Sequence, residues 1–266
     1  HPELLDWLAL EFVRGGWDVK QMHRLMVTSA TYRQSSVARG RVTNPSYWED
    51  PENRLLARGA RFRLSSLAIR DQALALSGLL VERTGGSPVK PYQPAGIWDD
   101  FSLGKIKYKR DTGEKLYRRS VYTFWRRSVA PTTLFDTANR LVCDVRPRRT
   151  NTPLHALTTL NDIAFVEAAR LFGQRILREG GETDDERLAW AFRSATSRHP
   201  TEAEMTVLRG ALDRSLATFT EDEEAAKKLL TIGEKPRDEK LPLAEHAAYT
   251  SVANIIMNLD EVLTRE

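Results

Sequence analysis

The sequence predicts a mainly α fold, a helical bundle around a central buried helix, with a small β element inserted at about residues 87–149. Apolar residues recur at helical spacing through the first and last thirds of the chain. Residues 163–178 are apolar around most of a helix circumference, which is typical of a buried helix. Residues 87–149 instead hold prolines, aromatic residues and β-branched residues, which favour extended backbone.

Three helices are predicted in the first part of the chain, at about residues 2–14, 18–30 and 64–80. A pair of glycines ends the first helix, and an aspartate begins the second as a cap. His23 lies within the apolar stripe of the second helix, so we expect it to be a core residue with one hydrogen-bond partner.

Asp71 lies in the middle of the apolar face of the third predicted helix. A buried carboxylate without a partner is costly, so Asp71 should meet an arginine or several backbone donors. Five arginines lie nearby in the sequence: Arg54, Arg58, Arg61, Arg63 and Arg70. We expect a structural ion pair, and a functional carboxylate is the alternative interpretation.

The middle of the chain predicts two or three short strands, with the clearest at residues 116–127 and a shorter one at 106–109. Charged residues are dense in and after these strands, and this density is the most site-like feature of the sequence. It includes Asp136, Asp144, Arg118, Arg119, Arg126 and Arg127. Asp71, Asp136 and Asp144 are therefore the weak candidates for a catalytic role.

The stretch from Arg146 to Arg178 is predicted to organise the fold. Thr152 and Pro153 suit the start of a short helix, with the threonine hydroxyl as a cap. Asp162 either ends that helix and caps the next, or lies inside one longer helix. The sequence leaves both alternatives open.

Three arginines precede this helix: Arg146, Arg148 and Arg149. They suit an anion site at a helix N-terminus, or salt bridges that hold the entry loop. The predicted anion or glycan site therefore comprises Arg118, Arg119, Arg146, Arg148, Arg149 and His155.

The last third is predicted to be helical. Thr201 and Glu204 have the spacing of a capping box, in which each side chain accepts from the other residue's free N–H. Residues 233–240 form a charged linker, and Pro242 opens the final helix. We predict a single domain over residues 1–266, with a helical part at 1–83, a loop and small β part at 84–149 and a second helical part at 150–266.

Charge is unevenly distributed along the chain, although its net value is only +4. Residues 1–150 hold 26 lysines and arginines against 15 acidic residues, while residues 151–266 hold 14 against 21. A basic half attracts anions, but no nucleic-acid motif accompanies the charge. An acidic glycan or an acidic partner domain fits equally well.

Several classes of site are excluded by the sequence. One cysteine, Cys143, leaves no internal disulfide, no Cys-x-x-Cys metal site and no haem attachment motif, and we expect it to be buried. The five histidines are scattered without metal-ligand spacing. We therefore predict no metal and no cofactor in this chain, and no apolar run is long enough for a membrane span.

Six strings resemble a known family. They are His1-Pro-Glu-Leu-Leu-Asp-Trp-Leu-Ala, Thr28-Ser-Ala-Thr-Tyr-Arg-Gln-Ser-Ser, Asn53-Arg-Leu-Leu-Ala-Arg, Tyr117-Arg-Arg-Ser-Val-Tyr-Thr-Phe-Trp, Arg149-Thr-Asn-Thr-Pro-Leu-His-Ala-Leu and Asn258-Leu-Asp-Glu. Over essentially its whole length the chain resembles the planctomycete-specific domain of unknown function found C-terminally in large exported proteins with a cytochrome-c-like domain. Two positions depart from that pattern: His155 replaces a usual glutamine, and Asp136-Thr-Ala-Asn replaces a usual Asp-Ala-Pro.

The resemblance implies context rather than chemistry. It implies a fragment of a larger exported protein of the periplasm or cell surface, with haem c elsewhere in the parent. An interaction or scaffold domain is favoured, binding other domains of the parent, an envelope component or an acidic polysaccharide. The alternative is an enzyme or redox-coupled module acting on polysaccharide, which needs two acid–base groups in an open cleft.

Overall fold

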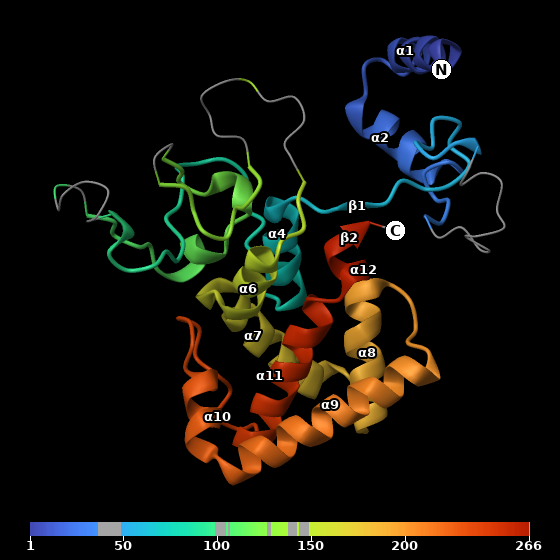
Figure 1. Ribbon diagram of the computed structural model, residues 1–266. Helices are drawn as coiled ribbons and strands as arrows, with labels where there is room; N and C mark the ends of the chain where they lie inside the picture. Colours follow the sequence, from blue (N-terminus) through green and yellow to red (C-terminus); the bar gives the residue numbers. More distant parts are fainter. Residues whose placement is uncertain are drawn as a thin grey trace. The chain divides into compact units, whose positions relative to one another are not determined.

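The computed structural model describes residues 1–36, 49–98, 105, 107–126, 129–137, 143 and 149–265 (Figure 1). The chain forms two compact units, one from His1–Phe62 together with Arg265, the other from Arg63–Thr264. The prediction of a single domain over residues 1–266 stays a prediction. None of the helices in the described part combines the length and the apolar character needed to cross a membrane.

The first unit contains two helices, α1 (Pro2–Arg14) and α2 (Val19–Thr28). Asp18 caps α2 as predicted, since its carboxylate accepts the N–H groups of Lys20 and Gln21. Neither helix buries a residue. The prediction that His23 is a core residue is therefore wrong: the side chain is exposed, because α2 has no packed core to contribute to.

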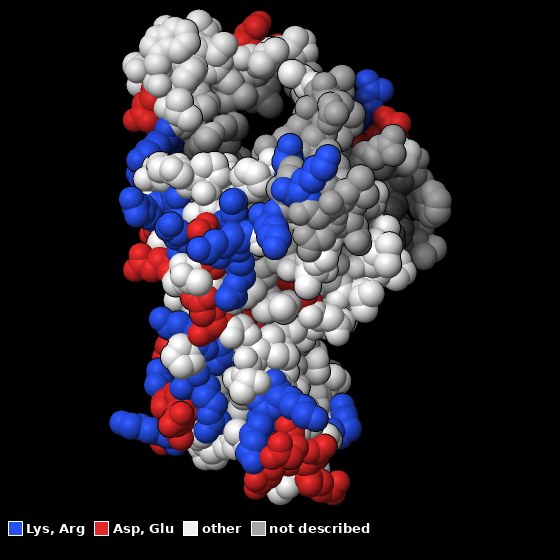
Figure 2. Space-filling view, turned by 90° about the vertical axis from the view of Figure 1, so that its left-hand side faces the viewer, with Lys and Arg blue, Asp and Glu red and all other residues white. Residues whose placement is uncertain are grey.

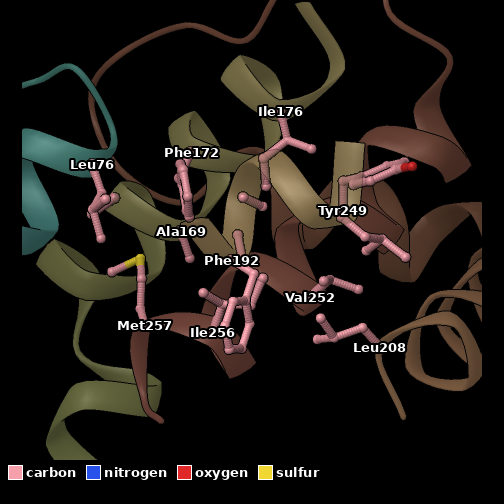
Figure 3. Close-up of a cluster of buried hydrophobic side chains, with 14 of the residues drawn as sticks. Leu76, Ala169, Phe172, Ile176, Phe192, Leu208, Tyr249, Val252, Ile256 and Met257 are labelled. Atoms are coloured by element: carbon pink, nitrogen blue, oxygen red, sulfur yellow. The ribbon is translucent and has the colours of Figure 1, made fainter. Parts of the chain in front are cut away.

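The core of the second unit is built on α7 (Ile163–Glu179) and α11 (Leu243–Met257), which pack along each other. Ala168, Ala169, Phe172 and Ile176 of α7 are completely buried. Figure 3 shows Ala169, Phe172 and Ile176 in one cluster with side chains of α11 and neighbouring helices. The predicted buried helix at residues 163–178 is thus confirmed, and so is the mainly α fold class.

The remaining helices of the second unit pack around this pair. They are α4 (Ser66–Leu76), α6 (Pro153–Asn161), α8 (Asp184–Thr196), α9 (Glu202–Glu221), α10 (Glu223–Leu230) and α12 (Asp260–Leu263). Asp162 ends α6 and caps α7, because its carboxylate accepts the N–H of Ala164. The predicted capping box of Thr201 and Glu204 begins α9. Thr152 precedes α6 without a side-chain cap bond, contrary to expectation.

The small β element is present, but not where the sequence places it. Strands β1 (Phe62–Arg63) and β2 (Thr264–Arg265) pair as a two-stranded sheet. The strand predicted at 116–127 is instead two short 3₁₀ helices, η1 (Gly113–Tyr117) and η2 (Ser120–Tyr122), followed by extended backbone. The carbonyls of Leu116 and Arg118 accept from the buried Arg70 side chain, and backbone pairing of this segment is limited to isolated bridges, as described below.

Candidate functional site

Two adjacent residues of α4, Arg70 and Asp71, bind the segment at 116–120, which carries the predicted site residues Arg118 and Arg119. Arg70 is almost completely buried, and its guanidinium donates to the carbonyls of Leu116 (2.7 Å) and Arg118 (3.0 Å) and to the Ser120 hydroxyl (3.2 Å). Burial lowers the pKa of Arg70, although the Asp71 carboxylate opposes this shift. A buried guanidinium presents several donors in one plane, so it can hold irregular backbone that has no strand partner.

Asp71 binds the same segment at residues 119 and 120. Its carboxylate accepts the backbone N–H of Ser120 at 2.6 Å and lies 3.4 Å from Nε of Arg119. The side chain is mostly buried, while that of Arg119 is mostly exposed. Asp71 thus has the arginine partner and the backbone donor that the sequence led us to expect, although the arginine comes from a distant segment.

Arg118 extends the framework to a second loop. Its buried guanidinium donates to the carbonyls of Arg83 (2.9 Å), Gly85 (2.5 Å) and Ser87 (3.2 Å) and stacks 3.8 Å from the centre of the Tyr122 ring. Isolated parallel bridges join Val81 to Arg118 and Val89 to Thr123, so residues 81–89 and 118–123 run side by side. Arg118 therefore faces inward and orders the loop at 83–87.

We call residues 83–126 the cationic segment, because they contain ten lysines and arginines against four acidic residues. Some of these cations have ion-pair partners: Arg110 with Glu234, Lys115 with Asp111, and Arg119 with Asp71. Five others are exposed and form no ion pair with any residue that the structure describes: Arg83, Lys105, Lys107, Lys109 and Arg126. Figure 2 turns towards the viewer the side that carries this segment in Figure 1, and lysine and arginine side chains gather on it.

A second set of contacts surrounds Asp136, which has a left-handed backbone (φ 55°). Its carboxylate accepts the backbone N–H of Thr150 at 2.6 Å and the Thr150 hydroxyl at 2.9 Å, and lies 4.0 Å from Nε2 of His155. Burial alone would raise the pKa of Asp136, but the two Thr150 bonds and the nearby charges of His155 and Arg63 bring it below its usual value. Asp136 is thus an ionised anchor for the chain entering α6.

His155 and Arg63 lie against the ring of Phe135. The imidazole stacks on it at 4.1 Å between centres, and the guanidinium lies 5.4 Å from its centre. Arg63 also donates to the Asn151 side-chain oxygen. Within the described residues, the hydrogen-bond partners of Asp136 differ from those of Asp71.

The other predicted site residues are placed only in part. Asp144, Arg146 and Arg148 lie outside the described residues. Arg149 is exposed and is not without a partner in the structure. Cys143, predicted to be buried, is exposed, because it takes part in none of the buried clusters of the described residues.

Sequence reasoning missed the polar side of α7. Glu167 is buried and accepts hydrogen bonds from the hydroxyls of Tyr92 and Tyr117 and from the backbone N–H of Lys235. Burial, followed by the Glu167 charge, raises the pKa of both tyrosines. Arg170 donates to the carbonyl of Ile232. The polar side of α7 therefore binds the backbone of the charged linker, a pairing that the spacing of residues along α7 does not reveal.

The described part of the chain contains no group of three or more His, Cys, Asp or Glu side chains that could hold a metal ion. A family model described as protein of unknown function (DUF1553) matches residues 1–212. The comparison with curated proteins found no match, and the comparison with solved structures found none.

Proposed function

Since the chain belongs to the DUF1553 family of proteins of unknown function, we propose a role from its own residues: an interaction domain that binds an acidic polysaccharide through the cationic segment. The resemblance to exported planctomycete proteins supports this role, because a cell-surface location would bring envelope polysaccharides within reach. The cytochrome-c-like domain would then lie elsewhere in the parent protein.

The observation that carries the proposal is the set of exposed cations without carboxylate partners on a fixed backbone. Between Lys107 and Lys109, the Tyr108 hydroxyl donates to the carbonyl of Pro91 at 2.8 Å and the Tyr108 ring stacks on Trp98, so these two lysines flank an anchored residue. Cations that are not neutralised locally attract a polyanion over about a Debye length, ~10 Å at 0.1 M salt. A pre-ordered surface also loses less conformational entropy on binding.

Binding is favoured over catalysis because the described carboxylate candidates already have partners. Asp71 accepts from Ser120 and lies against Arg119, and Asp136 accepts two bonds from Thr150. A general acid or base works best with a pKa near the working pH, whereas the pKa of Asp136 is lowered. An enzyme acting on polysaccharide remains the alternative and is distinguished by turnover.

The test is binding of the full chain to immobilised alginate and dextran sulfate, with neutral dextran as the reference polymer. We expect binding to both acidic polymers at low salt, little to neutral dextran, and strong weakening at about 1 M salt, where the Debye length is about 3 Å. The double substitution Lys107→Gln/Lys109→Gln should weaken binding by roughly thirtyfold, since each of the two cations contributes on the order of 1 kcal/mol at an anionic surface.

The matched control is Lys227→Gln/Lys228→Gln, which removes the same charge from exposed positions of α10. This variant should bind as the unchanged chain does. Equal loss in both variants would show that net charge alone drives binding and would refute a site in the cationic segment. Release of new reducing ends from the polymer would instead favour the enzyme.

A further inference from the structure

The first unit contains an apolar cavity that the polysaccharide proposal does not use. It has a volume of about 400 Å³ and lies between α1, α2 and the turn that follows residue 50. Its walls include Leu4, Trp7, Leu25, Met26, Tyr32 and Leu56. Ligand sites in proteins are typically concave, mostly apolar and about 300–1,000 Å³ in volume, with a few polar groups that fix orientation.

The turn that supplies Leu56 is held by its own polar framework. The Asp50 carboxylate accepts the N–H groups of Arg54 (2.8 Å) and Leu55 (2.7 Å), and the Leu55 bond is the main cause of its lowered pKa. The Asn53 side chain donates to the carbonyl of Arg58 at 2.7 Å. This framework keeps Leu56 in the left-handed region (φ 57°), which leucine rarely adopts. Strained residues persist where their surroundings fix them, and they cluster at binding sites.

Arg265 lies at the edge of the cavity, and part of its guanidinium is available to donate hydrogen bonds to a ligand. The Arg265 guanidinium stacks 3.8 Å from the centre of the Tyr32 ring, and Nη2 donates to the Tyr32 carbonyl at 2.6 Å. Its Nε and Nη1 form no hydrogen bond with any residue in the described ranges. Stacking fixes the plane of the guanidinium, so its remaining N–H groups are pre-organised for an anionic oxygen.

We propose that this cavity binds a small amphipathic anion, with an acidic head group at Arg265 and an apolar chain or ring against Trp7 and Met26. The apolar walls gain free energy by burying the body of such a ligand, and the guanidinium replaces the water around its acid group. The acid supplies the charge complementarity that a neutral apolar molecule lacks. The proposal does not depend on the polysaccharide role, because it uses only residues of the first unit.

The test compares decanoate with its neutral amide, decanamide, in calorimetric titrations of the full chain. We expect decanoate to bind more tightly than decanamide. Arg265→Gln should weaken decanoate by about tenfold, since a charged hydrogen bond is lost, and leave decanamide unchanged. Met26→Asp should abolish binding of both. Arg14→Gln is the matched control, because Arg14 is exposed at the end of α1 and does not line the cavity.

Circular dichroism establishes that each variant keeps its helices, so loss of binding is separated from loss of fold. Equal binding of the two ligands, with neither affected by Arg265→Gln, would refute the anionic head group. Failure of the folded, unchanged chain to bind either ligand would refute the cavity as a small-molecule site and favour a protein partner there.

Discussion

Gly173 is a point of close approach between α7 and α11, and its replacement by alanine tests the central packing. A Cβ at this position would lie 2.8 Å from the backbone nitrogen of Thr250 and 3.0 Å from the carbonyl carbon of Tyr249. These atoms belong to a helix backbone rather than to a flexible side chain. The α11 residues Ala248 and Val252 beside them are completely buried, so α11 has little freedom to move away.

Two opposing effects determine the free energy of unfolding of Gly173→Ala. Alanine gains about 1 kcal/mol over glycine in a helix interior. Overpacking a close-packed interface costs typically about 1–3 kcal/mol. Because the clash is with backbone, we expect overpacking to exceed the helix gain, with a net loss of about 1–2 kcal/mol.

Gly210→Ala in α9 is the matched control. Its Cβ would meet only the tip of the flexible Arg214 side chain, at 3.2 Å, so the helix gain should appear almost undiminished. The assay is urea unfolding followed by circular dichroism, with the slope m used to verify that both variants unfold as the unchanged chain does. If Gly173→Ala were as stable as Gly210→Ala, α7 and α11 could not approach as closely as described.

Two further predictions concern charged groups. Asp71→Ala should lower the free energy of unfolding by about 1–3 kcal/mol, because the Ser120 N–H loses its acceptor, and an unchanged melting temperature would contradict this pairing. The hydrogen bond from Arg198 lowers the pKa of Glu204 from 4.5 to about 2, so Glu204 stabilises the folded state above pH 4.5 and loses that effect as the pH falls towards 2. Glu204→Gln should flatten the fall in urea midpoint across this window, and an unaltered pH dependence would show that the pair contributes nothing.

The α7 helix could be predicted because its burial follows from local sequence. Apolar side chains on most of its circumference leave few orientations that expose it, and Gly180 and Asp162 mark its ends. Amphipathicity in α1 and α2 predicted the helices correctly but not their burial, as His23 shows. Periodicity determines which face would be buried, whereas burial itself depends on a partner surface elsewhere in the chain.

The polar side of α7 could not be predicted, because its partners lie 50 or more residues away in the sequence. Glu167 and Arg170 look like a solvent-facing stripe, yet both are 1% exposed. The same limit applies to the strand expected at 116–127. Its aromatic residues are there for burial, as with Tyr117, rather than for a strand ladder. The burial of Glu167 and Arg170 and the conformation of residues 116–127 depend on contacts with distant segments, which a local sequence pattern does not reveal.

The arginines of the cationic segment and its surroundings divide into two roles, and this division bears on how charge should be interpreted. The described part of the segment has few regular backbone pairings, so the carbonyls of residues 83, 85, 87, 116 and 118 need donors from elsewhere. Buried carbonyls are nearly always paired, and Arg70 supplies the donors for those of the buried residues Leu116 and Arg118, while Arg118 donates to the carbonyls of the more exposed loop at 83–87. The guanidinium groups of Arg70 and Arg118 are buried and donate to backbone carbonyls, so they are not accessible to a polymer.

A count of basic residues therefore overestimates the charge that can bind a ligand. Arg118 was a candidate for glycan binding on sequence, yet its guanidinium is directed at three carbonyls of the loop at 83–87. Lys107 and Lys109 did not stand out, yet they are exposed. The framework residues should affect binding only through stability, while the exposed lysines should affect binding at constant stability. The combination of melting temperature and affinity thus separates the two roles residue by residue.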